Sequence, residues 1–462
     1  MRSPPGRSKP SGMRHHGSCR RFWWSWGMSE WKSYALAELA VIRVSNVDKK
    51  SNAGESPVLL CNYMDAYSND YVTEDVEFME ATATAVEIEK FKIGKGDVLI
   101  TKDSETPYDI GIPSVVIDEI EGLVCGYHLA LIKPRVDLVD PVFLSKQLAS
   151  YETASYFSRV AAGSTRYGLS NGAISRTMLR APLLDKQRKI ARILQTIDQA
   201  IEKTEALIDK YQQIKTGLMH DLFTRGIGPD GQLRPPREEA PELYHETPIG
   251  WVPKEWVTKP LSETCEWYSG GTPSKSQEVW WRGNVPWLSP KDMKRFELSD
   301  TYHHVTRIAA LQGSRIVPEN TVFIVVRGMI LAHSFPVVLS QNEFAFNQDI
   351  KALIGCKSLG NRFLAYWLVA NANSFLKKTT ESTHGTKRFD LKDLYQIKIG
   401  VPSATEQDEI VLRMNIFECM VQSEIKRKGK LKIQKIALMH DLLTGKVPVR
   451  VDTVAEPEAV NA

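Results

Sequence analysis

Apolar residues recur at alternating steps of four and three positions in two stretches of the chain. In the first, from about residue 185 to 222, the repeating positions are Ile190, Leu194, Ile197, Ile201, Thr204, Ile208, Tyr211 and Leu218. In the second, Glu424 and Lys428 interrupt the stripe, whose apolar members are Ile410, Met414, Phe417, Val421, Leu431 and Leu438. This spacing is typical of a coiled-coil seam, and Gly226 and Gly445 are of the type that ends a helix. We therefore predict two long helices that pack against each other as an antiparallel coiled coil.

Both helices end in nearly the same peptide, "GLMHDLFTRG" at 217–226 and "ALMHDLLTGK" at 437–446, with Leu218 matching Leu438 at an offset of 220. The stretch from Pro182 to Leu222 aligns without a gap with the residues 220 positions later. At the same offset "FLSKQLAS" (143–150) aligns with "FLAYWLVA" (363–370). Solenoid repeats have periods of about 20–50 residues. The chain is therefore predicted to be a tandem duplication of a whole domain plus a helix.

The stretch before each helix mixes strands and short helices. Strands are predicted in "IGKGDVLITKD" (93–103), "PENTVFIVVRG" (318–328), "CGYHLALIKP" and "FNQDIKALIG". Short helices are expected around 141–157 and 360–376. The predicted fold class is α+β: two mixed α/β domains, each followed by a long helix, related by a pseudo-twofold axis. The predicted divisions are 28–182 (first domain), 183–226 (first helix), 227–248 (linker), 249–402 (second domain), 403–446 (second helix) and 447–462 (tail).

The first 27 residues carry six Lys or Arg and no acid, without the apolar core of a signal peptide. We interpret them as a disordered tail, or as sequence upstream of a true start at Met28. A basic DNA-binding arm is the alternative.

Composition and the absence of certain motifs narrow the range of possible functions. The net charge of +4 is compatible with nucleic-acid binding but does not establish it. The six cysteines form no CxxC pair, so we expect no structural zinc and a reducing cytoplasm. No apolar run reaches the roughly 18 residues of a membrane span. The chain also lacks a phosphate loop and a G-x-G-x-x-G motif, which argues against catalysis.

The order of the domains and helices, together with three stretches of sequence, resembles that of a known family. "APLLDKQRKIARILQTIDQAIEKTEALIDKYQQIKTGLMHDLFT", "IGWVPKEW" and "SGGTPSKSQEVWWRGNVPWLSPKDM" resemble the specificity subunit of type I restriction-modification systems, over residues 28–447. The resemblance implies that each front domain is a target-recognition domain that reads one half of a bipartite sequence in double-stranded DNA. It also implies that the helices space these domains and dock methylation subunits.

The same resemblance implies that this chain has no catalytic site, metal or cofactor of its own. Its expected partners are two methylation subunits, which use S-adenosylmethionine, and two motor-nuclease subunits, which use ATP and Mg²⁺. The expected location is the cytoplasm.

The candidate DNA contacts are residues with a hydroxyl or a positive charge that lie in a loop or at the end of a strand. Such side chains suit phosphate oxygens, and Arg or Lys can also read guanine. Lys102 and Arg327 are taken to end corresponding strands. The full candidate set is Lys102, Ser164, Thr165, Arg166, Thr272, Ser274, Lys275, Ser289, Lys291, Arg327, Thr386, Lys387 and Arg388.

Two other classes stay open. A self-sufficient methyltransferase-nuclease fragment is disfavoured by the missing motifs, and unaided methylation or cleavage of DNA would support it. A coiled-coil scaffold would be favoured if the chain bound no DNA even with a methylation subunit present.

Overall fold

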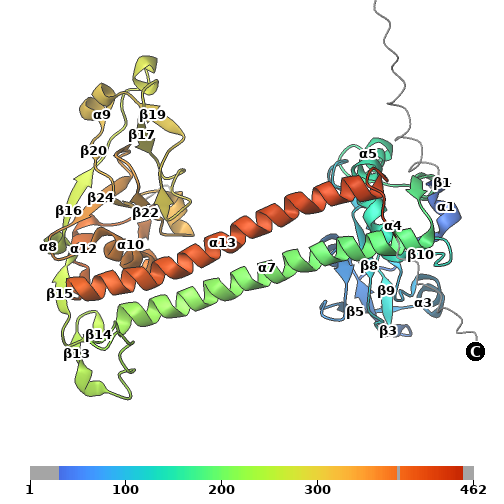
Figure 1. Cartoon of the computed structure of the whole chain (residues 1–462), viewed down its shortest axis with the longest axis horizontal. Coiled ribbons are helices and arrows are strands. Elements are labelled where there is room, and N and C mark those ends of the chain that lie inside the picture. The colour runs from blue at the N-terminus through green and yellow to red at the C-terminus, as the bar shows by residue number, and fades with distance from the viewer. Residues whose placement is uncertain (1–30, 382–385, 451–462) are drawn as a thin grey trace, which may run out of the picture. The chain divides into compact units, whose positions relative to one another are not determined.

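The computed structural model describes residues 31–381 and 386–450 (Figure 1). The predictions for residues 1–27, and for most of the tail at 447–462, lie outside this part. The chain divides into two compact units, of which the first holds residues up to Lys203 together with those from Lys428, and the second holds Thr204–Arg427. The long helices α7 (Leu184–Thr224) and α13 (Ala404–Leu443) each give one part to each unit. None of the described helices has the length and apolar character of a membrane span.

The first unit is built on a five-stranded sheet. Its strands, in sheet order, are β2 (Ala40–Val44), β10 (Leu129–Pro134), β6 (Val98–Thr101), β8 (Pro113–Val116) and β4 (Tyr71–Val72). All neighbours are antiparallel except β4 and β8. Alternate residues of the buried strand β6 join different cores, because successive side chains of a strand point to opposite faces. Val98 and Ile100 pack with Phe143 of α4 (Pro141–Leu148), and Leu99 packs toward a second sheet.

That second sheet contains β5 (Met79–Ala83), β3 (Ser56–Cys61) and β9 (Leu123–Cys125). The remaining strands form the pairs β1 (Lys32–Ala35) with β12 (Met178–Ala181) and β7 (Asp103–Ser104) with β11 (Tyr167–Gly168). The shorter helices are α1 (Leu36–Leu39), α2 (Tyr63–Tyr67), α3 (Ala85–Phe91), α5 (Tyr151–Val160) and α6 (Asn171–Ser175).

The second unit repeats this topology. Its main sheet runs β16 (Cys265–Ser269), β24 (Ile350–Gly355), β21 (Val322–Val325), β22 (Val337–Ser340) and β18 (Glu297–Leu298), with the last pair again parallel. The edge pair β15 (Val257–Pro260) with β27 (Lys398–Val401) corresponds to β1 with β12. The same strand order in both units confirms the predicted duplication.

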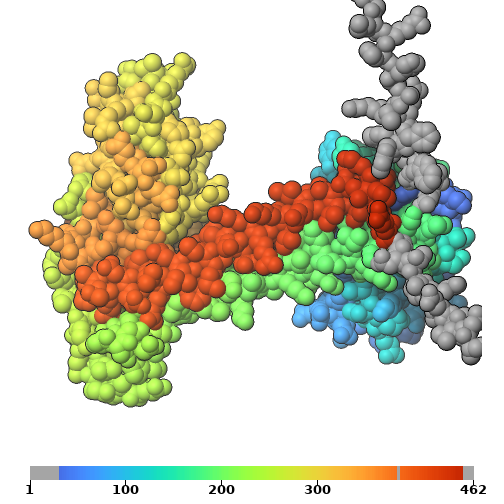
Figure 2. All heavy atoms as spheres, viewed as in Figure 1, coloured from blue at the N-terminus to red at the C-terminus, as the bar shows by residue number. Residues whose placement is uncertain are grey.

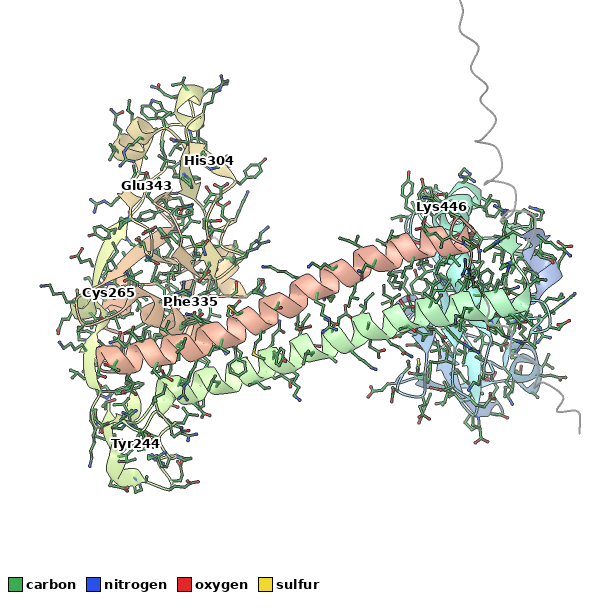
Figure 3. The ribbon with its side chains drawn as sticks, viewed as in Figure 1. Tyr244, Cys265, His304, Phe335, Glu343 and Lys446 are labelled. Carbon is green, nitrogen blue, oxygen red and sulfur yellow. The ribbon has the colours of Figure 1, made fainter. Side chains whose placement is uncertain are left out.

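The second unit differs in its other sheet, which contains β19 (His303–Val305), β17 (Val285–Leu288), β23 (Phe344–Phe346) and β20 (Ile316–Val317). Its shorter helices are α8 (Leu261–Thr264), α9 (Arg307–Gly313), α10 (Asn361–Ala370), α11 (Ala372–Leu376) and α12 (Leu391–Gln396). Figure 3 shows His304 and Glu343 at the end of this unit away from α13, and Cys265 and Phe335 closer to that helix.

Two glutamines anchor the starts of the long helices in the same way. The side chain of Gln187 donates to the carbonyls of Pro182 (2.9 Å) and Leu138 (3.1 Å) and accepts from the amide of Asp140 (3.0 Å). Gln407 makes the same three bonds with the residues 220 positions later, Ser358, Gly360 and Pro402. The offset read from the sequence therefore extends to individual hydrogen bonds.

The predicted seam is largely buried, and it packs against the domains as well as between the helices. Figure 2 shows α13 lying along α7. The buried positions are Ile190, Leu194, Ile197, Ile201, Thr204, Ile208, Ile410, Met414 and Val421. The partly buried ones are Tyr211, Leu218, Phe417, Leu431 and Leu438. In the first unit Ile190 and Leu194 share a core with Phe143, Leu442 and Leu443.

The helix ends contribute buried residues that the seam pattern omits. Leu222 and Phe223 in the second unit, and Leu442 and Leu443 in the first, pack into the domain cores. In the second unit Lys215 pairs with Glu418, and Ile227 contacts Glu406, so the helices run antiparallel there. The equivalent pair in the first unit, Asp198 with Lys435, lies at 2.7 Å.

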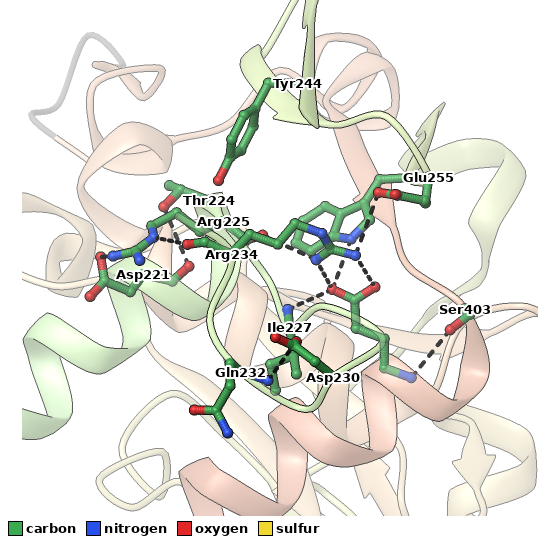
Figure 4. Close-up of polar contacts among 12 residues, drawn as sticks. Asp221, Thr224, Arg225, Ile227, Asp230, Gln232, Arg234, Tyr244, Glu255 and Ser403 are labelled. Carbon is green, nitrogen blue, oxygen red and sulfur yellow. Dashed lines mark hydrogen bonds and ion pairs between the residues drawn. The ribbon is translucent and has the colours of Figure 1, made fainter. Parts of the chain in front are cut away.

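The segment predicted as a linker is folded onto the second unit (Figure 4). It forms η1 (Pro241–Leu243) and the hairpin of β13 (Tyr244–Thr247) and β14 (Gly250–Pro253). The carboxylate of Glu406 accepts from Nη1 and Nη2 of Arg234 (2.6 and 3.2 Å), the Ile227 amide (2.8 Å) and the Trp256 indole (3.1 Å). Gly226, with φ of 63°, leaves no room for a side chain beside that carboxylate. The helix end predicted at this glycine is confirmed.

A partly buried cluster of charges fixes α7 and α13 to the first domain. Lys146, only 3% exposed, contacts Asp70 (3.0 Å) and Asp198 (2.8 Å), and Lys435 contacts the same two carboxylates. Burial by itself would raise the pKa of Asp70, but the two ammonium groups outweigh it and hold the pKa at about 2. An unfolded aspartate has a pKa of about 3.9. The cluster therefore stabilises the unit above that pH, and this contribution is lost as the pH falls toward 2.

Candidate nucleic-acid interface

In the first unit, three segments meet where β6 ends. The amide of Lys102 donates to the carbonyl of His128 (2.9 Å), in the turn before β10. The carbonyl of Lys102 accepts from the amide of Leu169 (2.8 Å), and Gly168 pairs with Asp103. The strand end, the turn and the loop after α5 therefore form one surface. Of the predicted contacts, Ser164, Thr165 and Arg166 are exposed on that loop.

The charges on this surface are partly neutralised. The carboxylate of Asp103 contacts the ammonium of Lys102 (2.7 Å) and Nδ1 of His128 (2.5 Å). Burial would raise the pKa of Asp103, but these two hydrogen bonds lower it below its ordinary value. His128 has a φ of 71°, in the left-handed region that non-glycine residues rarely adopt. Such backbone strain gathers at functional sites, although it does not identify one by itself.

The second unit builds the same edge with different charges. The guanidinium of Arg327 contacts Asp349 at 2.6 Å, and the amides of Val326 and Arg327 both donate to the carbonyl of Asp349. The backbone of Arg327 also forms a β-bridge with Arg388, as the backbone of Asp103 does with Gly168. The prediction that Lys102 and Arg327 follow corresponding strands is confirmed, because β6 and β21 hold the same place in their sheets. The residue that corresponds to Arg327 is Asp103, and Lys102 corresponds to Val326. Arg327 lies 224 positions after Asp103, whereas Arg388 lies 220 positions after Gly168, so a single offset along the sequence does not align them.

The predicted loop residues of the second unit join this edge. The carbonyl of Lys387 accepts from the amide of Gly328 (3.0 Å), and its ammonium pairs with Glu381 (2.8 Å). Thr386 is half-buried, and Arg388 is exposed.

Two more predicted contacts reach the same edge through the turn before β24. Thr272 donates to the side-chain oxygen of Gln348 (2.7 Å). Ser289 follows β17, whose last carbonyl, that of Leu288, accepts from the amide of Asn347 (3.0 Å). Lys291, two residues further, is exposed.

Ser274 and Lys275 have a different environment. The hydroxyl of Ser274 contacts Ser276 (2.8 Å), and its carbonyl accepts from the Trp281 indole (3.2 Å) in η2 (Glu278–Trp281). Among the described contacts, none joins Ser274 or Lys275 to Arg327.

Sequence reasoning missed the turn residues of both units. His128 and Tyr127 lie in the first turn, and Gln348 and Asp349 in the second. Each pair lies within a stretch in which the sequence predicted a strand, directly before the strand of the structure begins, so these polar residues were the available signal. The exposed side chains at both edges can donate hydrogen bonds and carry charge toward a nucleic acid. Among the described residues, no three His, Cys, Asp or Glu side chains are placed to hold a metal ion.

Comparison with known proteins assigns the family. Residues 28–212 and 253–434 each match the type I restriction modification DNA specificity domain. The chain belongs to this family and carries its domain twice.

Individual relatives agree. The chain is 32% identical over 212 residues to the type I restriction enzyme EcoR124I/EcoR124II specificity subunit of Escherichia coli, a match that covers 45% of this chain and 52% of that one. It is 22% identical over 480 residues to the HindI specificity subunit of Haemophilus influenzae, covering 91% and 100%.

Two solved structures share the fold. One, described as the structural basis of complex assembly and conformational transition of the type I R-M system, has a TM-score of 0.55 at 16% identity, covering 91% of this chain and 99% of that one. The other, the S subunit of a type I restriction-modification system from M. genitalium, has a TM-score of 0.52 at 15% identity, covering 91% and 97%.

Proposed function

We propose that this chain is the DNA-reading subunit of a type I restriction-modification complex, and that each unit reads one half of a bipartite target in double-stranded DNA. The observation that carries the proposal is the repeated edge with different charges. Asp103 with His128 in the first unit stands where Arg327 with Asp349 stands in the second. Different charges at equivalent positions favour different bases, because direct readout depends on matching donors and acceptors.

The proposal extends to partners. Methylation subunits would bind this chain and use S-adenosylmethionine, and motor-nuclease subunits would use ATP and Mg²⁺. The chain would supply sequence recognition and no catalytic group. Methylome sequencing of the source cell is the direct test, with a bipartite methylated motif as the expected result. A purified chain that methylated or cut DNA unaided would contradict the non-catalytic role.

Specific binding is expected to depend strongly on salt and to require the methylation subunit. The net charge of +4 gives this chain little electrostatic excess of its own. Each phosphate contact should contribute about −0.9 to the slope of log K against log salt concentration. A fluorescence anisotropy titration at several salt concentrations measures this slope, with the chain alone as the control. A flat salt response would refute the expectation.

The two units are expected to read their half-sites independently. Changing Lys387 and Arg388 together to Ala should weaken the preference at the half-site of the second unit and leave the other unchanged. Each base contact that is lost should reduce discrimination by about 1–3 kcal/mol. The measurement is binding to a library with either half-site randomised. Arg166→Ala is the matched variant in the first unit and should give the reciprocal pattern. Equal loss at both half-sites in either variant would contradict independence.

A further inference from the structure

Three lysine or arginine side chains are buried among the described residues: Lys146, Arg234 and Lys351. Lys146 is paired with Asp198 at 2.8 Å, and Arg234 with Glu406 at 2.6 Å. Within the described part of the chain, no carboxylate contacts Lys351, although it is only 9% exposed. Its ammonium donates to the hydroxyl of Ser269. A buried charge without a counter-charge is costly, so Lys351 requires an explanation.

The register of the main sheet places Lys351 at the edge that carries the candidate interface. It lies opposite Ser269, the last residue of β16, and opposite Ile324 of β21. Two residues before it, Asp349 holds Arg327. Ser269 is exposed, so the ammonium bonded to it lies close to the surface although the lysine stem is buried.

The first unit shows that the fold does not need a cation at this position. There the corresponding pair is Ala130 opposite Val44, the last residue of β2, with Ala130 also opposite Ile100 of β6. Ala130 is fully buried in the core. An apolar residue therefore satisfies the same place in the sheet. Burial also lowers the pKa of Lys351, which means that its ammonium is poorly hydrated and would gain from an anion.

We propose that the ammonium of Lys351 contacts a backbone phosphate of the DNA half-site read by the second unit, an inference that rests on the proposed function. A phosphate oxygen supplies the negative charge that the protein does not. Lysine suits this role because its ammonium is a compact point charge with three donors, one of which Ser269 already orients. Since phosphate contacts position a protein on DNA without reading sequence, Lys351 would strengthen binding and leave base preference unchanged.

The test replaces Lys351 with Met, which keeps the length of the side chain and removes the charge. The full chain, assembled with its methylation subunits, is titrated with DNA that carries the methylated motif. We expect about tenfold weaker binding and a salt slope smaller by about 0.9. Preference at both half-sites should persist, and the melting temperature should stay the same or rise. Lys351→Ala, which introduces the residue found in the first unit, is the second variant.

Lys357→Met is the matched control, because Lys357 is exposed beyond the other end of β24. It should change neither affinity nor slope. Unchanged affinity and slope in both Lys351 variants would overturn the assignment. Loss of preference at the second half-site would also overturn it, since it would indicate a base contact. If the unaltered complex showed no sequence-specific binding, the proposed function itself would fail.

Discussion

A fragment of residues 28–227 is expected to form a dimer and to direct methylation to a palindromic target. The fragment keeps the first domain and the whole of α7 but loses α13. In the intact first unit, Leu442 and Leu443 pack into the domain core, Lys435 contacts Asp198 at 2.7 Å, and the carbonyl of Leu443 accepts from Gln147 at 2.9 Å. Without them the stripe on α7 would be exposed, and apolar area of that kind marks an interface.

The duplication provides the replacement in a second copy of the fragment. Lys215 lies 220 positions before Lys435, and Leu222 and Phe223 lie 220 positions before Leu442 and Leu443. The second copy's α7 can therefore contact Asp198 and fill the core as α13 does. The assembly becomes truly twofold, so its target should contain the first half-site twice in inverted orientation.

Light scattering gives the mass of the fragment, and methylation assays with the methylation subunit give its target. Lys215→Glu is the informative control, because it would place a carboxylate against Asp198 of the other copy and should weaken the dimer. A strictly monomeric fragment would contradict the equivalence of the two units. So would a fragment that assembles but still modifies an asymmetric site.

The sequence predicted those parts of the fold that follow from periodicity. The long helices could be predicted because the apolar residues from Ile190 to Leu218 lie on one face of a helix, and that face must pack against another apolar surface. The helix ends could also be predicted, because glycine favours the positive φ that ends a helix, and Gly226 and Gly445 both adopt it.

The polar contacts at the candidate interface could not be predicted from the sequence. Asp103 contacts His128, which is 25 positions away, and Arg327 contacts Asp349, which is 22 positions away. Nothing in their spacing indicates which side chain each carboxylate will contact. The candidate loops stay a prediction from their hydroxyls and cations, and the alignment of Arg327 with Asp103 depends on backbone hydrogen bonds. Lys351 was missed for a related reason: its importance lies in a counter-charge that is absent, which only the fold reveals.

The largest stability effect is expected from Asp198→Asn. Asp198 accepts from Tyr71 (2.7 Å) and pairs with Lys146 (2.8 Å) and Lys435 (2.7 Å), and its side chain is 8% exposed. Removing its charge leaves Lys146, which is 3% exposed, with only Asp70 as a counter-charge. Breaking a buried ion pair in this way destabilises a protein by about 3–5 kcal/mol. The loss should be confined to the first unit.

Glu418→Gln is the matched control, since Glu418 stands 220 positions after Asp198 and pairs with Lys215. Both of these side chains are 25% exposed, so water screens the pair, and the expected loss is at most about 1 kcal/mol. Hydrogen exchange followed by mass spectrometry can report the two units separately, with peptides from β10 and α4 for the first and from β21 and α10 for the second. Faster exchange is expected in the first unit of Asp198→Asn and nearly unchanged exchange in the second unit of Glu418→Gln. Equal effects of the two substitutions would mean that burial does not distinguish these equivalent ion pairs.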